Sequence, residues 1–363
     1  AACEKEMLGR VISASDSAVV GVAPPSATEY LQRHHISSER AAAILASLGG
    51  GAIVTLRGLS QVTDEIIDRA NRLITESTVS ERIRYLSGVG SRVPGYAGHE
   101  KSAQYIESVF RNYGLSDVRT EAYHVTAPVD EGGRMRLETG EEIPIHGVWP
   151  NLIKTSTLPE AGVSTHLIYG GHGEFKDFDG HRVEGAAVLM EFNSWNNWLN
   201  AATLGAEQII FVEPDSSSYS EAEQKFLQVP NSVERFWVSK ADGDKLKERL
   251  AREGELSVHL TSRMDWQKAP ARNVIGTIPG TDPVLKDRLI VINAYYDAMS
   301  VVPALAPGAE MAGGIVGLLE LVSYLSTHPP KHTVMFLASS GHHLGFRGIC
   351  DFLSRHSRKE KHF

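Results

Sequence analysis

The feature that most constrains the fold is a pair of apolar runs, separated by a largely apolar helix pattern, near the C-terminal end of this 363-residue chain. The runs are 288–294 and 332–338, and the helix pattern covers 313–325. Strands that are apolar on both faces are typical of parallel sheets covered by helices on either side. The two runs are therefore predicted to be adjacent parallel strands of an α/β fold.

The rest of the chain repeats this alternation on both sides of a middle unit. A helix at 98–113, ended by a glycine, and strands at 118–125 and 273–278 have the expected periodicities. We expect residues 63–144 and 268–363 to form one α/β domain, with a mostly parallel sheet and helices on both faces.

Residues 145–267 are predicted to be a smaller α/β insert. Strands are expected at 186–191, 208–212 and 236–238, and a helix at 241–251. Trp195 and Trp198 are expected in the core of this insert rather than in a ligand platform. Residues 1–62 are interpreted as an N-terminal helical segment of unknown role.

Composition excludes some classes of function. The net charge of −8 includes no basic excess that would indicate a nucleic-acid-binding protein. No apolar run is long enough to cross a bilayer, so no membrane span is expected in this chain. The two cysteines, Cys3 and Cys350, lie too far apart in the sequence to indicate a disulfide framework or a cysteine-based zinc site.

The first residues carry a weak targeting signal. Ala1, Ala2 and Cys3 look like the end of a lipoprotein processing box, which would indicate an extracytoplasmic or membrane-anchored protein. An ordinary frayed terminus is the alternative.

Three stretches together resemble the M28 family of di-zinc exopeptidases. They are 86–114, which contains Ser-Arg-Val-Pro-Gly; 273–280 followed by 290–297; and 307–352, which begins Pro-Gly-Ala. The middle unit resembles the protease-associated domain that such enzymes often carry. The resemblance implies two zinc ions about 3.5–4 Å apart, held by histidine and carboxylate ligands at the carboxyl ends of parallel strands.

The resemblance also indicates which residues of this sequence stand at the family's metal-ligand and general-base positions. Most of these positions hold a side chain that differs from the family's. Tyr295 stands where the family has its first histidine ligand, and Asp297 matches the carboxylate that orients that histidine. The bridging carboxylate corresponds to Glu310 if one residue is deleted, and otherwise to Met311. His342 stands at the position of the general-base glutamate and His343 at that of the adjacent ligand glutamate.

The family's last two ligands would lie downstream of Phe363, so the peptidase-like domain is predicted to be incomplete at its C-terminus. Each lost carboxylate would remove about 4 kcal/mol of attraction to a zinc ion, even at an effective dielectric near 20. A neutral tyrosine is also a poorer donor than histidine. The standard di-zinc centre is therefore not expected to assemble.

Two functions from different classes follow. The first is a non-catalytic binding or scaffold module with a protein or peptide partner and no cofactor, as in degenerate relatives such as nicastrin and the transferrin receptor. The second is a metallopeptidase or other metal-dependent hydrolase with an altered ligand set. In that case Asp297, Glu310 and His343 would hold zinc, and His342 would act as the base.

Each of these side chains also has an interpretation without metal. His342 and His343 could be polar loop-tip residues bonded to their neighbours. Asp297 could cap a nearby N–H group. Glu310 could interact with the dipole of the helix that follows it.

Overall fold

The computed structural model describes residues 76–151, 154–226 and 231–356. The chain divides after residue 73, and the description below concerns the second part alone. The predicted segment 1–62 lies outside the described residues, as do residues 63–75. Among those residues, no helix is long and apolar enough to cross a membrane.

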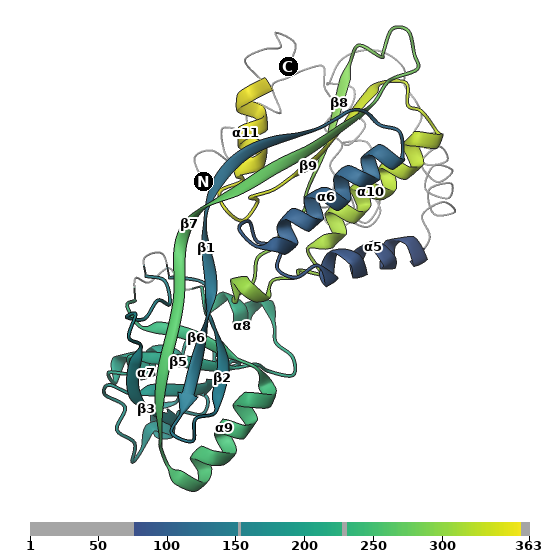
Figure 1. Cartoon of the computed structure of the whole chain (residues 1–363). Helices are drawn as coiled ribbons and strands as arrows, with labels where there is room; N and C mark the ends of the chain where they lie inside the picture. Colours follow the sequence, from purple (N-terminus) through teal and green to yellow (C-terminus); the bar gives the residue numbers. More distant parts are fainter. Residues whose placement is uncertain (1–75, 152–153, 227–230, 357–363) are drawn as a thin grey trace, which may run out of the picture. The chain divides into compact units, whose positions relative to one another are not determined.

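All strands of the described part belong to one nine-stranded sheet with the order β1-β2-β6-β5-β4-β3-β7-β9-β8 (Figure 1). The strands are β1 (Ser116–Leu137), β2 (Glu142–Gly147), β3 (Val163–Tyr169), β4 (Ala187–Glu191), β5 (Gln208–Val212), β6 (Glu234–Val238), β7 (Leu256–Ile278), β8 (Leu289–Tyr295) and β9 (Thr333–Ser339). The helices are α5 (Glu76–Gly88), α6 (Ala97–Asn112), α7 (Trp198–Thr203), α8 (Tyr219–Glu223), α9 (Lys240–Glu253), α10 (Ala312–Thr327) and α11 (Arg347–His356), with short 3₁₀ turns at Phe175–Phe178 and Pro303–Leu305. The α/β class predicted from the sequence is confirmed.

The two apolar runs are neighbouring parallel strands, as predicted. β8 pairs with β9 in parallel, with Ala294 opposite Ala338. A second parallel group is formed by β3, β4, β5 and β6. The long strands β1 and β7 connect the two groups through antiparallel pairings, so both kinds of pairing occur in this sheet.

β1 and β7 are far longer than the strands predicted from the sequence, which were 118–125 and 273–278. Pro128 and Pro270 lie beyond the predicted ends of these strands but inside the ladder, opposite Trp266 and His124. The Ala122 carbonyl accepts a bond from Arg355 on α11, so even-numbered residues in this part of β1 point their backbone groups away from β7. A proline at such a position removes no bond from the ladder, which explains why both strands continue.

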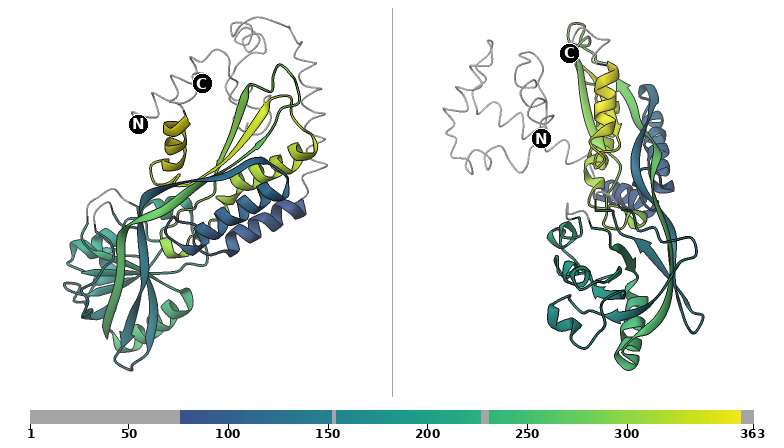
Figure 2. Two further views of the ribbon diagram at one scale, coloured as in Figure 1. Left: turned by 45° about the horizontal axis from the view of Figure 1, so that its top comes forward. Right: turned by 90° about the vertical axis from the view of Figure 1, so that its left-hand side faces the viewer.

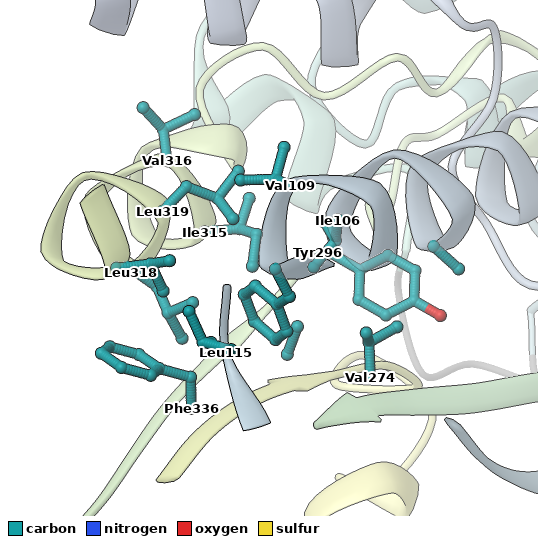
Figure 3. Packing of buried hydrophobic residues seen from close by; sticks show 14 of the residues in the cluster. Ile106, Val109, Leu115, Val274, Tyr296, Ile315, Val316, Leu318, Leu319 and Phe336 are labelled. Atoms are coloured by element: carbon teal, nitrogen blue, oxygen red, sulfur yellow. The ribbon is translucent and has the colours of Figure 1, made fainter. Parts of the chain in front are cut away.

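Helices cover both faces of the C-terminal strands. α6 and α10 pack on one face of β7 and β9, where Ile106, Phe110, Leu319 and Phe336 are fully buried (Figure 3). α11 covers the opposite face (Figure 2). There Phe352 packs against Ile275 and Leu337. Each fully buried side chain of this size contributes about 1.5–3 kcal/mol of stability, so this core fixes the ends of β8 and β9.

The strands β3 to β6 carry two further apolar clusters. One includes Leu189, Phe236 and Leu246 of α9, and the other includes Phe211 and Trp198 of α7. Trp198 is fully buried, as predicted for the insert. The prediction for Trp195 is wrong: its side chain is 54% exposed, because its residue precedes α7 in a loop with φ of +49°.

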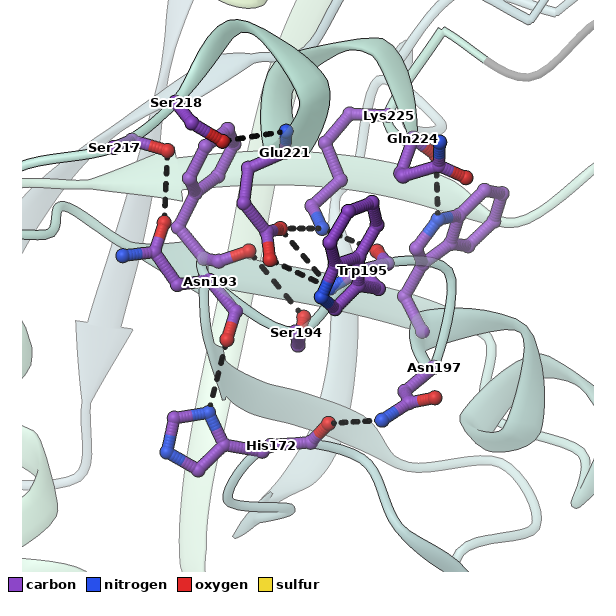
Figure 4. Close-up of polar contacts among 12 residues, drawn as sticks. His172, Asn193, Ser194, Trp195, Asn197, Ser217, Ser218, Glu221, Gln224 and Lys225 are labelled. Carbon is purple, nitrogen blue, oxygen red and sulfur yellow. Dashed lines mark hydrogen bonds and ion pairs between the residues drawn. The ribbon is translucent and has the colours of Figure 1, made fainter.

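A buried ion pair holds the loop of Trp195 (Figure 4). The Glu221 carboxylate accepts the Trp195 N–H at 3.0 Å, and the Lys225 ammonium donates to the Trp195 carbonyl. Lys225 also lies 3.4 Å from Glu221 and is fully buried near the rings of Phe192 and Phe211. Burial lowers the pKa of Lys225 to about 8. Backbone strain of this kind persists only where the surroundings fix it, as they do here.

Candidate functional site

The candidate site lies where β8 and β9 end. Tyr295, the last residue of β8, pairs with Ser339, the last residue of β9. Since parallel neighbours end at the same edge of a sheet, the loops that follow them lie side by side. Asp297 belongs to the first loop, and His342 and His343 belong to the second. The sequence placed these four residues together, and the structure does the same.

Three rings form a compact cluster at this edge. The Tyr295 ring stacks face to face on the His342 ring, with centroids 3.9 Å apart and planes 13° apart. The edge of the His343 ring meets both, at 5.5 Å from Tyr295 and 5.0 Å from His342. Phe346 adds a further edge contact to His342 at 4.7 Å. The edge contacts fall in the range of favourable aromatic centroid distances, and the stacked pair is closer still.

Both imidazoles in the cluster are neutral at pH 7. Burial lowers the pKa of His342 below its usual value. Burial, with a smaller effect of His342, lowers the pKa of His343 to about 4. The Nε2 atom of His343 is buried and has no hydrogen-bond partner in the described part of the chain. The cluster therefore presents uncharged nitrogen atoms rather than the negative charge of two glutamates.

Asp297 holds the loop after β9, which carries His342 and His343, through a backbone hydrogen bond. Its carboxylate is fully buried and accepts the backbone N–H of His342 at 3.0 Å. Burial raises the pKa of Asp297 to about 7, against the opposing effects of these backbone bonds and of Arg92. Its Oδ1 atom has no partner within the described residues. The interpretation of Asp297 as a carboxylate that caps a nearby N–H is consistent with this geometry.

Arg92 is a residue of this site that the sequence did not reveal. It is fully buried, and its guanidinium donates to the Gly308 carbonyl at 2.7 Å. Its backbone N–H donates to Ala306 at 3.0 Å, and its carbonyl accepts from Ala298 at 3.3 Å. Burial lowers its pKa to about 10, so it stays charged at pH 7. The only available signal was an arginine inside the turn Ser-Arg-Val-Pro-Gly.

A second unpredicted group supports the loop after β9. His99 of α6 lies 2.7 Å from the Ser340 hydroxyl and stacks on Tyr296, with ring centroids 5.1 Å apart. The Tyr123 hydroxyl of β1 donates to the Ser340 carbonyl at 2.9 Å. Burial, followed by the charges of Arg272 and Arg92, lowers the pKa of His99 to about 3. These contacts hold the base of the loop that carries both site histidines.

Glu310 is not part of the cluster. It is exposed in the turn before α10, and its carboxylate has no hydrogen-bond or ion-pair partner in the described part of the chain. The neighbouring Met311 points toward the site loops, because its sulfur lies 3.3 Å from the Met299 N–H. The sequence left both residues open for the bridging-carboxylate position. Tyr295 and His343 thus meet in the cluster, and Glu310 does not join them.

The donor atoms in this cluster do not fit a pair of zinc ions. A zinc site normally has three or four protein donors, and within the described ranges no group of three or more His, Cys, Asp or Glu residues is arranged to hold a metal. The two unpartnered donors are Asp297 Oδ1 and His343 Nε2. The charged guanidinium of Arg92 acts electrostatically on Asp297 and would oppose a second cation there.

The comparisons with known proteins agree with this fold. Residues 273–362 match the sequence model of peptidase family M28. This stretch is therefore similar in sequence to M28 peptidases. Nicalin from Caenorhabditis elegans is 31% identical over 94 residues, which cover 24% of this chain and 16% of nicalin.

Two solved structures show the M28-like fold across most of the chain. A zinc aminopeptidase from Bacillus subtilis superposes with a TM-score of 0.52 and 22% identity, covering 77% of this chain and 64% of the enzyme. A peptidase M28 precursor from Shewanella amazonensis gives a TM-score of 0.54 at 14% identity, covering 82% of this chain and 72% of that protein. The chain thus spans less than two thirds of both nicalin and the Bacillus enzyme.

Proposed function

We propose that this M28-like domain is a binding or scaffold module without standard di-zinc peptidase activity. The observation that carries the proposal is the stacking of Tyr295 on His342. The two positions that the family resemblance assigns to a metal ligand and a general base hold rings that bind each other. A phenol and two neutral imidazoles can recognise a polar group of a protein or peptide partner by hydrogen bonds, without metal.

The charge of the site supports this proposal. The neutral histidines replace two glutamates, and burial favours the protonated form of Asp297. The main fixed charge among the described site residues is the cation of Arg92. Such a site suits an acceptor group, such as a carbonyl or a carboxylate of a partner, better than it suits two divalent cations.

The domain boundaries remain part of the proposal. Residues 63–144 and 268–363 would form the peptidase-like domain, with 145–267 as a protease-associated-like insert. Supporting this division, one apolar cluster draws its residues from α6, α10, β7 and β9, whereas another lies among β3 to β6 and α9.

The alternative function, a hydrolase with an altered ligand set, has one observation in its favour. Asp297 Oδ1 and His343 Nε2 are buried donors without a partner in the described part of the chain. Together with an outside ligand, they could hold a single metal ion.

Metal content and turnover separate the two functions. The purified chain, dialysed against zinc and then against buffer, should retain fewer than two tight equivalents by elemental analysis. It should not hydrolyse aminoacyl p-nitroanilides at neutral pH. The combined variant Tyr295→His, His342→Glu and His343→Glu should not gain activity, because too few other ligands are present.

The proposal has a clear counter-result. The proposal would be overturned if the unmodified chain hydrolysed these substrates, lost that activity to a chelator and regained it with zinc. The activity would also have to be abolished by His343→Ala. His181→Ala, which changes an exposed histidine away from the site, is the matched control.

A further inference from the structure

The strand β1 has an edge that no other strand covers within the described residues. β7 pairs with one edge of β1 along its length, and β2 pairs with the other edge only at residues 133–136. Before that point, the second edge faces α11 and solvent. Ala122, His124 and Thr126, whose backbone groups face this edge, are all exposed.

Side chains satisfy this edge at its two ends and leave its middle open. At one end, Arg355 donates to the Ala122 carbonyl at 2.7 Å. At the other end, the Tyr96 hydroxyl accepts the Asp130 N–H at 2.7 Å and contacts the Pro128 carbonyl at 3.3 Å. Between these points, the N–H and C=O groups of His124 and Thr126 have no partner in the described part of the protein. They repeat about every 6.8 Å, which is the spacing of an extended chain.

A positively charged groove runs along this open edge. It has a volume of about 650 Å³ and lies between residues 122–126 of β1 and helix α11. Lys268, Arg347 and Arg355 line it, and Asp351 is the one carboxylate among the lining residues. Asp351 is itself 2.6 Å from Arg355 and 4.0 Å from Arg347. The neighbouring Glu121 is paired with Arg119 and His356.

We propose that this groove binds an extended acidic peptide segment, which adds as a strand to the open edge of β1. The peptide backbone would bond to His124 and Thr126, and its acidic side chains would reach Lys268 and Arg347. Main-chain bonds supply affinity in this mode of recognition, and alternate side chains supply specificity. The groove is separate from the ring cluster of Tyr295 and His342, so the proposal does not depend on the function proposed for that site.

A fluorescein-labelled peptide with the sequence TEVEVET is a suitable probe for fluorescence anisotropy with the purified chain. It should bind, and more weakly as the ionic strength rises, because salt screens exposed charges. Two control peptides isolate the two parts of the proposal. TKVKVKT reverses the charge, and TEVEVET methylated on alternate backbone nitrogens keeps the charge but blocks strand pairing. Both should bind at least about tenfold more weakly.

Variants of the chain test the same two parts. Lys268→Glu combined with Arg347→Glu should weaken binding of TEVEVET about tenfold or more, whereas Lys101→Glu, on the exposed surface of α6, should leave it unchanged. Thr126→Pro removes the outward N–H and should abolish binding. If that variant does not fold, the methylated peptide still decides the question. Equal binding of the methylated and unmethylated peptides, or of the acidic and basic peptides, would overturn the proposal.

Discussion

Single buried charges position the side chains that this protein presents at its surface and at its candidate site. Arg92 binds the carbonyl of Gly308, and Lys225 binds the carbonyl of Trp195. In each case a cation is taken out of water and bonded to a loop backbone. A buried charge is tolerated only when it has such partners, so these loops and their cations depend on one another.

Lys225→Met should destabilise the protein by about 3 kcal/mol, because it leaves the Glu221 carboxylate without its cation. Adding Glu221→Gln should recover part of the loss, since glutamine can still accept the Trp195 N–H. The midpoint of urea unfolding measures both effects. Lys176→Met, which removes an exposed lysine, should change stability little. Equal losses for the single and double variants would show that the pair is not coupled.

His99 should make the protein sensitive to acid. Its pKa is about 3 in the folded chain and near 6.5 when unfolded. Between these values the unfolded state binds more protons, so the stability from this group is present above about pH 6.5 and is lost as the pH falls toward 3. His99→Gln should flatten the pH dependence of the unfolding free energy over this window. An unchanged slope would mean that other groups control acid unfolding.

The residues of the site could be predicted only where they directly follow a strand that the sequence indicates. Tyr295, Asp297, His342 and His343 follow two strands that the sequence revealed, so their proximity could be predicted. The choice between Glu310 and Met311 could not, because one residue of register in a turn decides which side chain points inward. Arg92 and His99 were missed because their partners lie far away along the chain, at Gly308 and Ser340.

At the scale of elements, the paired strands β1 and β7 show the limits of reading prolines as breaks. Their ladder continues through Pro128 and Pro270, because both fall at positions whose backbone groups face away from the partner strand. The sequence shows where a proline stands, but not whether its backbone nitrogen faces the partner strand or the other edge. Three helices were predicted more closely, because α6, α9 and α10 begin and end within two residues of expectation, whereas α5, α8 and α11 were not predicted.

The same alternation predicts opposite outcomes for two neighbouring substitutions. Val125→Pro should strongly destabilise the protein, because the Val125 N–H faces β7 opposite Ala269 and the side chain is buried. Thr126→Pro should cost far less, because the Thr126 N–H faces the open edge. Urea unfolding of the two variants provides the comparison. Similar costs would show that the assignment of the two edges is wrong.

At the scale of the whole described part, the strand β7 contributes to both of the largest apolar clusters. Leu260 and Val258 of β7 are buried among β3 to β6, and Val274 and Ile278 of the same strand are buried against α6 and α10. A continuous strand that belongs to both cores gives them a shared element. Unfolding of one core should therefore disturb the other.

Leu260→Ala tests this coupling. The side chain is fully buried, and its truncation should cost about 2–5 kcal/mol. Hydrogen exchange followed by mass spectrometry should show faster exchange in α9 and also in α10, which lies at the other core. Loss of protection in α9 alone would indicate two independently unfolding units. Ser164→Ala, at an exposed position of β3, serves as the control.

The pairing of β1 with β7 also suggests how the residues between these strands could be inserted or lost during evolution. Asp130 and Met264 face each other directly, and everything between them leaves and returns at that one pair. A two-residue turn placed there would close a hairpin and preserve the pairings from Ser116 to Asp130. The bonds lost to the remaining part would include those of the Trp149 N–H to the Val301 carbonyl, the Gly147 N–H to the Asp130 carboxylate and the Met264 N–H to the Thr157 hydroxyl. Residues 131–263 could thus be acquired or discarded in one genetic event that keeps the pairings of β9 with β7 and β8.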